Sequence, residues 1–431
     1  MDPDRTCPRC AKFNQLERAV VLDVERLDDV LVVTVETPRS PVGCPTCGVV
    51  AWVKDRRTVE LVDLPISGTP SRLRWRKRRF CCPEPSCPQG AWTETEPTIA
   101  SSRLTMTDRA GRWICYQVGH DGRTVSEVAR ELGCDWHTIN DAVLAYGTPL
   151  VDDPARIGRV NALGLDEHLF VREGERRQRC FVTAIADVGH GQLLDLVPDR
   201  SAESSIRWLL ARGEPWRSEI TTGTLDLSAS YRSVFERCVP AATLVADPFH
   251  VVRVATNQME KCRRRVQQES LGHRGRRPDP LYRSRRLLTM AQERLGEDGT
   301  AKVLELLATG DVFGQVTAAW HAKEAVRELY AHADEETAAA WIDELIESMT
   351  DRHHPPEVRS LGRTLHRWRD QIIAWHRTHV SNGPTEALNN LAKRVKRVAF
   401  GFRSFANYRV RVLLLVFNGS AQQSRESTTM C

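Results

Sequence analysis

Three carboxylates in this 431-residue chain stand at positions that could support catalysis: Asp166, Asp226 and Glu386. Asp166 lies near the middle of a strand-like segment, Asp226 ends another, and Glu386 lies in the first turn of a predicted helix. Hard divalent cations such as Mg²⁺ and Mn²⁺ prefer oxygen ligands, so carboxylates that converge would hold such ions. Taken singly, each residue is better explained as a turn, cap or first-turn residue. The functional interpretation therefore depends on the elements that bring the three together.

The segment SNGPTEALNNLAKRVKR, residues 381–397, predicts the helix that would present Glu386. Pro384 suits the first helical position, and Gly383 can serve as the preceding cap. On a period of about 3.6 residues, one face is apolar and packs into a core. The other face would carry Glu386, Asn390, Lys393 and Arg397. This face offers a carboxylate followed by positive charge.

Residues 159–250 predict the sheet that would position the two aspartates. VNALGLDEHLF, RCFVTAIADV and GQLLDLVP look like three consecutive antiparallel strands, and a helix, a strand, a helix and a strand follow. This is the order of a ribonuclease H-like fold, in which the first and fourth strands are neighbours. Asp166 and Asp226 can therefore face one another across a narrow gap, and Glu386 could complete the set.

The block VADPFHVV places two further candidates, Asp247 and His250, after the last of these strands. Asp247 could be a fourth acidic ligand, and His250 could contact a scissile phosphate. A helix cap and a packed histidine explain the two residues equally well. We expect both, together with Asn390, to support the site from outside the three carboxylates.

The first 100 residues predict a metal-binding module, because their cysteines occur in closely spaced pairs. Zinc favours four soft ligands in a tetrahedron, and two pairs on short turns supply them. We assign the ligands to Cys44, Cys47, Cys82 and Cys87. In the alternative assignment, the zinc ligands are Cys7 and Cys10 together with Cys44 and Cys47. Neither assignment includes a histidine or carboxylate that would indicate an open position, so we expect structural zinc in a ribbon with a basic hairpin.

Positive charge is concentrated in runs, although the formal net charge is only +5. The run RLRWRKRR covers residues 72–79, and ten Lys/Arg against two acids occur in residues 261–286. Such clusters indicate a phosphate-backbone partner. Between them, TVSEVARELGCDWHTINDAV has the spacing of a helix-turn-helix. The expected DNA contacts are Arg74, Arg76, Lys77, Arg78, Arg79, Trp136, His137, Thr138, Asn140, Arg263, Arg264, Arg265, Lys393 and Arg397.

The sequence thus predicts a multidomain α+β protein. The expected parts are a zinc module (1–100), a helix-turn-helix (101–150), the first part of a ribonuclease H-like core (158–254), an all-helical insertion (255–378), the closing helices of the core (379–419) and a disordered tail (420–431). No apolar run approaches the roughly 20 residues that span a bilayer, and no signal-peptide pattern begins the chain. We therefore expect a cytoplasmic protein without a membrane partner, associated with the nucleoid when bound to DNA.

Several blocks together resemble one family: CPTCG, RRFCCPEPSC, GLDEH, TLDLSASY, VADPFHVV, and SNGPTEALNNLAKRVKR followed by FGFRSFANYRVRVLL. Over nearly its whole length the chain resembles the ISL-three family of bacterial insertion-sequence transposases. The resemblance implies that Asp166, Asp226 and Glu386 are a catalytic Asp-Asp-Glu triad holding two Mg²⁺ or Mn²⁺ ions. The Cys7/Cys10 pair departs from the family pattern and leaves the zinc ligands less certain.

The implied function is DNA recombination: binding of the terminal inverted repeats of an insertion sequence, then metal-dependent strand cleavage and strand transfer into target DNA. Both element ends must be held together, so a homodimer or larger assembly on double-stranded DNA is expected. Two alternatives stay open. A sequence-specific regulator or inactive transposase remnant would bind DNA without cleaving it, and a structure-directed nuclease or resolvase would cleave without preferring the flanking repeats.

Overall fold

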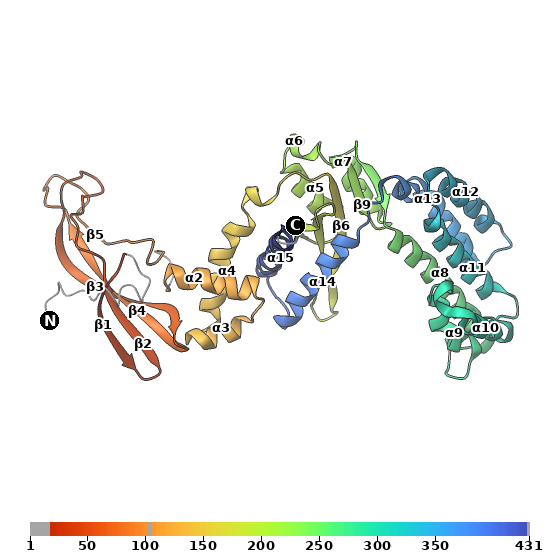
Figure 1. Cartoon of the computed structure of the whole chain (residues 1–431), viewed down its shortest axis with the longest axis horizontal. Helices are drawn as coiled ribbons and strands as arrows, with labels where there is room; N and C mark the ends of the chain where they lie inside the picture. Colours follow the sequence, from red (N-terminus) through yellow and green to blue (C-terminus); the bar gives the residue numbers. More distant parts are fainter. Residues whose placement is uncertain (1–17, 102–104, 429–431) are drawn as a thin grey trace. The chain divides into compact units, whose positions relative to one another are not determined.

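The computed structural model describes residues 18–101 and 105–428, so the predicted Cys7/Cys10 pair lies outside the described residues. The chain divides into two compact units (Figure 1). Unit 1 joins the residues up to Ile157 with those from Leu391 onward, and unit 2 is Gly158–Asn390. Among the described residues, no helix is long and apolar enough to cross a membrane. Each unit is built around its own sheet.

Unit 1 begins with a sheet of five strands: β1 (Val20–Leu27), β2 (Val30–Glu36), β3 (Trp52–Ile66), β4 (Thr69–Cys81) and β5 (Ala91–Thr93). The order is β1-β2-β4-β3, with β5 also pairing with β4. Ser67 and Gly68 join β3 to β4 with φ values of 51° and 79°, which suits a two-residue hairpin turn. Leu61, Leu73 and Trp75 form part of the core of this sheet. The long β3–β4 hairpin is the basic hairpin that the sequence predicted.

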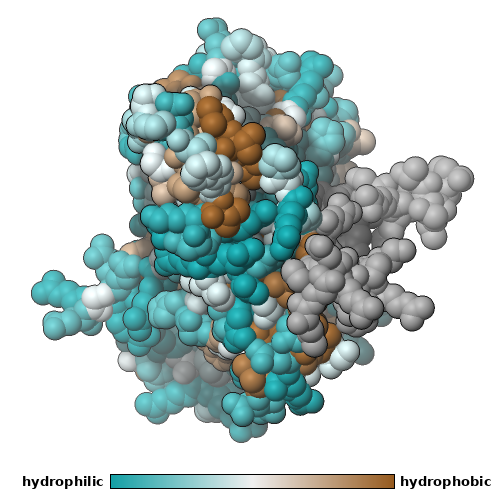
Figure 2. Space-filling view, turned by 90° about the vertical axis from the view of Figure 1, so that its left-hand side faces the viewer, coloured by the Kyte–Doolittle hydropathy of each residue, from teal (hydrophilic) through white to brown (hydrophobic). Residues whose placement is uncertain are grey.

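Hydrophobic side chains also reach the surface of unit 1. Figure 2 shows brown, hydrophobic patches among hydrophilic side chains on the face of the molecule that it draws. Val50, Trp52 and Val53 are exposed near the beginning of β3, and Trp52 is 67% exposed. In the sequence, these exposed residues directly follow the pair Cys44 and Cys47.

The N-terminal helices of unit 1 include the two that the segment TVSEVARELGCDWHTINDAV predicted. These N-terminal helices are α2 (Asp108–Cys115), the π-helical η1 (Tyr116–His120), α3 (Val125–Leu132), α4 (Trp136–Val151) and the short 3-10 helix η2 (Pro154–Arg156). Thr124 and Glu127 form a capping box at the beginning of α3. Gly133, with φ of 59°, ends α3, and Asp135 caps α4 by accepting from the Thr138 N–H. Two short helices with a tight turn result.

The C-terminal helix α15 (Phe405–Thr428) packs in unit 1 against η1 and α4. A Cβ atom at Gly119 would lie 2.8 Å from Leu414, and one at Gly147 would lie 2.8 Å from Leu414 and 2.9 Å from Val410. The two glycines therefore permit the close approach of α15. The sequence placed residues 379–419 in the catalytic core and predicted a disordered tail from residue 420. In the structure, the residues from Leu391 belong to unit 1, and α15 continues to Thr428.

Unit 2 contains a mixed sheet in the order β10-β9-β6-β7-β8. Its strands are β6 (Ala162–Glu173), β7 (Gln178–Asp187), β8 (Gln192–Pro198), β9 (Thr222–Leu225) and β10 (Thr243–Ala246). Strands β6, β7 and β8 form an antiparallel meander, and β9 lies parallel to both β6 and β10. The helices α5 (Ala202–Leu210), α6 (Glu214–Arg217) and α7 (Ala229–Cys238) make the connections. The predicted order of elements and the pairing of the first with the fourth strand are confirmed.

The segment between β10 and α14 is helical, as predicted. It comprises α8 (Pro248–Leu271), α9 (Pro280–Thr289), α10 (Gln292–Gly310), α11 (Gln315–Glu328), the 3-10 helix η3 (Leu329–Ala331), α12 (Glu335–Thr350) and α13 (Pro356–Thr378). Helix α14 (Gly383–Val398) follows a four-residue connection and carries Glu386.

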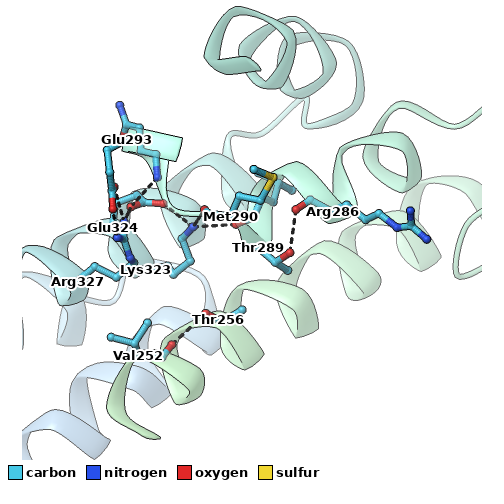
Figure 3. Close-up of polar contacts among 11 residues, drawn as sticks. Val252, Thr256, Arg286, Thr289, Met290, Glu293, Lys323, Glu324 and Arg327 are labelled. Atoms are coloured by element: carbon cyan, nitrogen blue, oxygen red, sulfur yellow. Dashed lines mark hydrogen bonds and ion pairs between the residues drawn. The ribbon is translucent and has the colours of Figure 1, made fainter. Parts of the chain in front are cut away.

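A buried lysine ties α9 to α11 (Figure 3). Lys323 is fully buried, and its Nζ donates hydrogen bonds to the carbonyl oxygens of Leu288 (2.8 Å) and Met290 (2.7 Å). These are carbonyl groups at the C-terminal end of α9, which no residue within that helix can satisfy. Lys323 also forms an ion pair with Glu324, so its charge is compensated. This part of the helical segment therefore contains a buried polar contact that joins two of its helices.

Candidate functional site

Asp166 and Asp226 each directly follow one residue of a pair that joins two neighbouring parallel strands. Leu165 of β6 pairs with Leu225 of β9, and each aspartate is the next residue along its strand. Strand β9 ends at Leu225, whereas β6 continues past Asp166. The two carboxylates thus come directly after the paired residues Leu165 and Leu225. The sequence predicted that the first and fourth strands would be neighbours in this way.

Asn382, in the connection before α14, fastens this helix to the two strands. Its side chain donates to the Leu165 carbonyl (3.3 Å) and accepts from the Thr224 hydroxyl (3.1 Å). Its backbone N–H donates to the Asp247 carboxylate (2.8 Å), and its carbonyl accepts from the Glu386 N–H (3.1 Å). Asn382 is only 1% exposed, so these bonds are shielded from water. One buried residue therefore sets where the first turn of α14, with Glu386, begins.

Gly164 allows α14 to approach β6 this closely. A Cβ atom on Gly164 would lie 2.5 Å from the Thr385 hydroxyl and 2.7 Å from the Asn382 side-chain oxygen. Contacts this short do not occur between real atoms, so any larger residue would displace the beginning of α14. No local pattern marks this glycine, because its role depends on a helix more than 200 positions away.

Gly164→Ala is expected to reduce both the stability of the protein and its activity. Overpacking costs about 1–3 kcal/mol, whereas a shift of Glu386 by about 1 Å can lower a reaction rate roughly a hundredfold. Thermal unfolding measures the change in stability, and the rate of turnover on the natural substrate measures the change in activity. Gly158→Ala is the matched control, because nothing lies within 4 Å of a Cβ atom there. Equal activity of the two variants would contradict the positioning role of Gly164.

Asn389 links α14 directly to Asp166. Its Nδ2 donates to Asp166 Oδ2 (2.7 Å), and its Oδ1 lies 2.8 Å from His168 Nδ1. The other oxygen of Asp166 accepts from the Glu167 N–H (2.8 Å). Asn389 is buried, whereas Asn390, the residue that the helical period favoured, is exposed. The observed contact with Asp166 thus comes from the position three residues after Glu386, on the same side of the helix.

Asp226 has a carboxylate oxygen without a hydrogen-bond partner. It is largely buried, and its Oδ1 has no hydrogen-bond partner. Burial raises its pKa to about 6, the charges of Asp166 and Glu167 add to this rise, and the nearby His250 opposes it. A buried carboxylate oxygen without a donor is the kind of group that a cation would satisfy.

Asp247 and His250 form a pair beside Asp226. Asp247 caps α8, accepting from the His250 N–H, and its Oδ2 lies 3.2 Å from His250 Nδ1. This contact raises the pKa of His250, and the charges of Asp226 and Asp166 raise it further. The pKa of Asp247 is lowered: although burial opposes its ionisation, the bonds from His250 and from the Asn382 N–H outweigh that effect. Asp247 is thus the N-cap of α8, and the raised pKa of His250 favours its protonated form next to the acids.

The acids are more widely spaced than the cysteines. Within residues 18–101 and 105–428, the only group of three or more potential ligands within 4.8 Å of one another is Cys44, Cys47, Cys82 and Cys87. Asp166, Asp226 and Glu386 therefore do not gather as tightly. Carboxylates without a counter-charge repel one another. The unpartnered oxygen of Asp226 and its raised pKa nevertheless fit a divalent cation at this position.

The cysteine quartet fits a tetrahedral zinc ion. The Sγ atoms of Cys44 and Cys87 are 3.7 Å apart, and those of Cys47 and Cys82 are 3.5 Å apart. Zn–S bonds of about 2.3 Å in a tetrahedron require sulfur–sulfur distances near 3.8 Å. Burial opposes ionisation of Cys44, but N–H groups of Cys47 and Thr46 outweigh it and lower the pKa of Cys44 to about 7. The first ligand assignment is confirmed for the described residues, and structural zinc follows from it.

The predicted DNA contacts differ widely in exposure. Arg78, Asn140 and Arg263 are buried. Arg78 pairs with Glu94 (2.6 Å), and Arg263 pairs with Glu260 (2.9 Å), so both guanidinium groups are engaged inside the protein. Arg74, Lys77, Arg79, Thr138 and Arg265 are half-buried. The exposed members are Arg76, Trp136, His137, Arg264, Lys393 and Arg397.

Comparison with known proteins identifies the family. A family model described as a transposase, of the ISL-three type, matches residues 163–412, and a model described as the zinc-finger of transposase IS204/IS1001/IS1096/IS1165 matches residues 40–87. The transposase match contains Asp166, Asp226 and Glu386, and the zinc-finger match contains all four clustered cysteines.

Two relatives have the same description. The transposase for insertion sequence element IS1557 of Mycobacterium tuberculosis is 27% identical over 290 residues, which cover 62% of this chain and 63% of that protein, less than two thirds of its length. The transposase for IS1001 of Bordetella parapertussis is 24% identical over 368 residues, covering 84% of this chain and 85% of that protein. Since the transposase model matches more than half of the sequence, the chain belongs to the ISL-three family of transposases.

Proposed function

We propose that this protein is a DNA transposase that binds the terminal inverted repeats of an insertion sequence, cleaves the DNA at the repeat boundary and joins the freed strand to target DNA. Family membership supports the reaction class. The observation that carries the proposal is the arrangement of Asp166 and Asp226 after a registered pair of strands, with α14 fastened to both strands through Asn382.

The topology of unit 2 supports a ribonuclease H-like core. An antiparallel meander of three strands, extended on the side of its first strand by two parallel strands with helical connections, is the strand arrangement of that fold. The helical segment between β10 and α14 is then an insertion, and α14 returns the chain to the sheet. Ligands of open sheets that contain parallel strands bind at the carboxyl ends of those strands, where Asp226 lies.

Asp166, Asp226 and Glu386 would hold the catalytic cations. Bound there, two Mg²⁺ or Mn²⁺ ions would neutralise the scissile phosphate and activate the attacking water or 3′-hydroxyl oxygen. Asn389 holds the orientation of Asp166, and Asn382 holds the first turn that carries Glu386. His250, whose pKa is raised by Asp247, would donate to a phosphate oxygen in its protonated form.

Unit 1 supplies the DNA-binding surface in this proposal. The capped helices α3 and α4 form a helix-turn-helix, in which the beginning of α4 exposes Trp136 and His137. The hairpin β3–β4 adds the exposed Arg76 next to the zinc module. Contacts from such residues to phosphates would hold the repeat, and contacts to base edges would select it. Two ends must be held at once, so the active form is a homodimer or larger assembly.

Strand cleavage of a labelled duplex tests the proposal. The duplex carries the repeat that flanks the gene, and the reaction contains Mg²⁺ or Mn²⁺. Wild type is expected to nick at the repeat boundary, whereas Glu386→Gln is expected to lose at least a thousandfold in rate and to keep its DNA affinity. Glu203→Gln is the control, because Glu203 is an exposed first-turn glutamate of α5 in the same unit.

The outcomes separate the transposase from the alternatives. Binding without cleavage, with both metals and with paired ends supplied, would favour a regulator or an inactive remnant. Cleavage of scrambled DNA at the same rate as the repeat would favour a nuclease. Full activity of Glu386→Gln would remove Glu386 from the catalytic set.

A further inference from the structure

A cavity of about 680 Å³ lies within unit 1, beside the predicted recognition helix. It is lined by the first turn of α3, the first turn of α4 and the turn that joins α14 to α15. Its lining includes the aromatic residues Trp136, Phe400 and Phe402 and the basic residues Arg130, Arg403 and Arg411. The cavity therefore combines ring surfaces with positive charge.

Phe400 combines an exposed aromatic ring with a left-handed backbone conformation. Its side chain is 97% exposed, and its backbone has φ of 55°, in the left-handed region that favours glycine. The bonds from Phe400 N–H to the Arg397 carbonyl (3.1 Å) and from Gly401 N–H to the Lys396 carbonyl (2.9 Å) end α14 in the way that a glycine normally does. A large apolar ring in such a position costs both conformational energy and solvation. A ligand that covers the ring would offset the second cost.

Arg411 is a buried positive charge without an anion. Arg411 is 6% exposed, and its Nε has no hydrogen-bond partner. Its contacts are a 3.5 Å bond from Nη2 to the Arg123 carbonyl and the face of the Phe402 ring, 5.3 Å away. Burial lowers its pKa to about 10. Within the described part of the chain, no carboxylate oxygen lies within 4.0 Å of this guanidinium; Glu127, which also lines the cavity, is engaged at the cap of α3.

We propose that this cavity binds one unpaired nucleotide of a DNA strand, with its base against Phe400 and Trp136 and its phosphate at Arg411. Aromatic rings accept any base by stacking, and guanidinium groups bind phosphate through paired N–H donors. The nucleotide must be unpaired, since bases inside a duplex do not present their faces. The proposal rests on the proposed function, because it assumes that the protein acts on DNA, and it adds a site outside the three carboxylates.

Fluorescence anisotropy tests the base-stacking part. The probes are a fully paired duplex carrying the flanking repeat and the same duplex with one unpaired thymidine. Wild type is expected to prefer the second probe about tenfold, the lower range of base–aromatic stacking. Phe400→Ala should remove this preference, and Phe313→Ala, which changes an 84% exposed phenylalanine in the turn between α10 and α11, should keep it. Retention of the preference by Phe400→Ala would overturn the proposal.

Arg411→Met tests the phosphate part and separates binding from folding. Methionine preserves much of the side-chain volume and removes a buried charge without an anion, so the thermal midpoint should stay the same or rise. Affinity for the probe with the unpaired thymidine should fall about tenfold. A lower midpoint with unchanged affinity would show a structural arginine and overturn the proposal. If wild type binds neither probe, the proposed function fails; if it binds both equally, only the nucleotide site fails.

Discussion

Asp226→Asn is expected to abolish strand cleavage and, at the same time, to make the protein more stable at neutral pH. Asp226 is largely buried, its Oδ1 has no donor, and the charges of Asp166 and Glu167 face it. Asparagine has nearly the same shape, carries no charge and cannot replace a carboxylate as a ligand of Mg²⁺. Gain of stability with loss of activity is the signature of a residue retained for function.

The stability difference should depend on pH, with a sign that follows from the pKa. Burial raises the pKa of Asp226 from 3.8 to about 6. The folded protein therefore holds this proton more tightly than the unfolded chain, and stability decreases as pH rises from about 4 to about 6. A shift of this size corresponds to roughly 3 kcal/mol. Asp226→Asn should match wild type at pH 4 and exceed it by up to about this amount at pH 7.5.

Urea unfolding in the presence of a chelator measures the free energy of unfolding of wild type and Asp226→Asn at pH 4 and pH 7.5. Asp195→Asn is the control: Asp195 is also buried in the sheet, but it accepts from the Trp208 indole (2.8 Å), so its replacement should destabilise. Addition of Mg²⁺ or Mn²⁺ at pH 7.5 should raise the thermal midpoint of wild type and leave that of Asp226→Asn unchanged. A destabilised Asp226→Asn, or a variant that still responds to the metal, would contradict this account.

Cys44→Ser is expected to remove the bound zinc and to unfold the knuckle at the ends of β3 and β4. Cys44 is buried, its carbonyl accepts from the Gly48 N–H, and its N–H donates to the Val49 carbonyl. Structural zinc sites contribute folding free energy outright, about 10–16 kcal/mol in isolated zinc-finger peptides. The basic hairpin would lose its anchored end, so affinity for the repeat should fall at least tenfold.

Elemental analysis and hydrogen exchange check this prediction, with one zinc per chain expected for wild type and none for Cys44→Ser. Cys81→Ser is the matched control: Cys81 precedes Cys82 directly, but its Sγ faces the Trp52 carbonyl and it is not among the clustered ligands. A double Cys7/Cys10→Ser variant should also keep its zinc. Loss of zinc from that variant would instead support the alternative ligand set.

Local sequence signals were sufficient for the caps, the strand order and the cysteine quartet. Thr124, Gly133 and Asp135 end or begin helices through bonds within a few residues, so their roles are visible in the sequence. The four cysteines are similarly marked by two short spacings. Exposure was less predictable: Arg78 lies in a continuous basic run, yet it is buried against Glu94 because side chains alternate between the two faces of a strand.

The sequence by itself determined the types of element, the residues able to hold metals and the family they resemble, because these depend on periodicity and on short spacings. Only the tertiary structure decided which residues support the carboxylates. The helical period pointed to Asn390, but Asn389 reaches Asp166, and neither Gly164 nor Asn382 carries a local signal for its contact with α14. Contacts between residues about 220 positions apart depend on how closely two elements pack, and no local pattern encodes that distance.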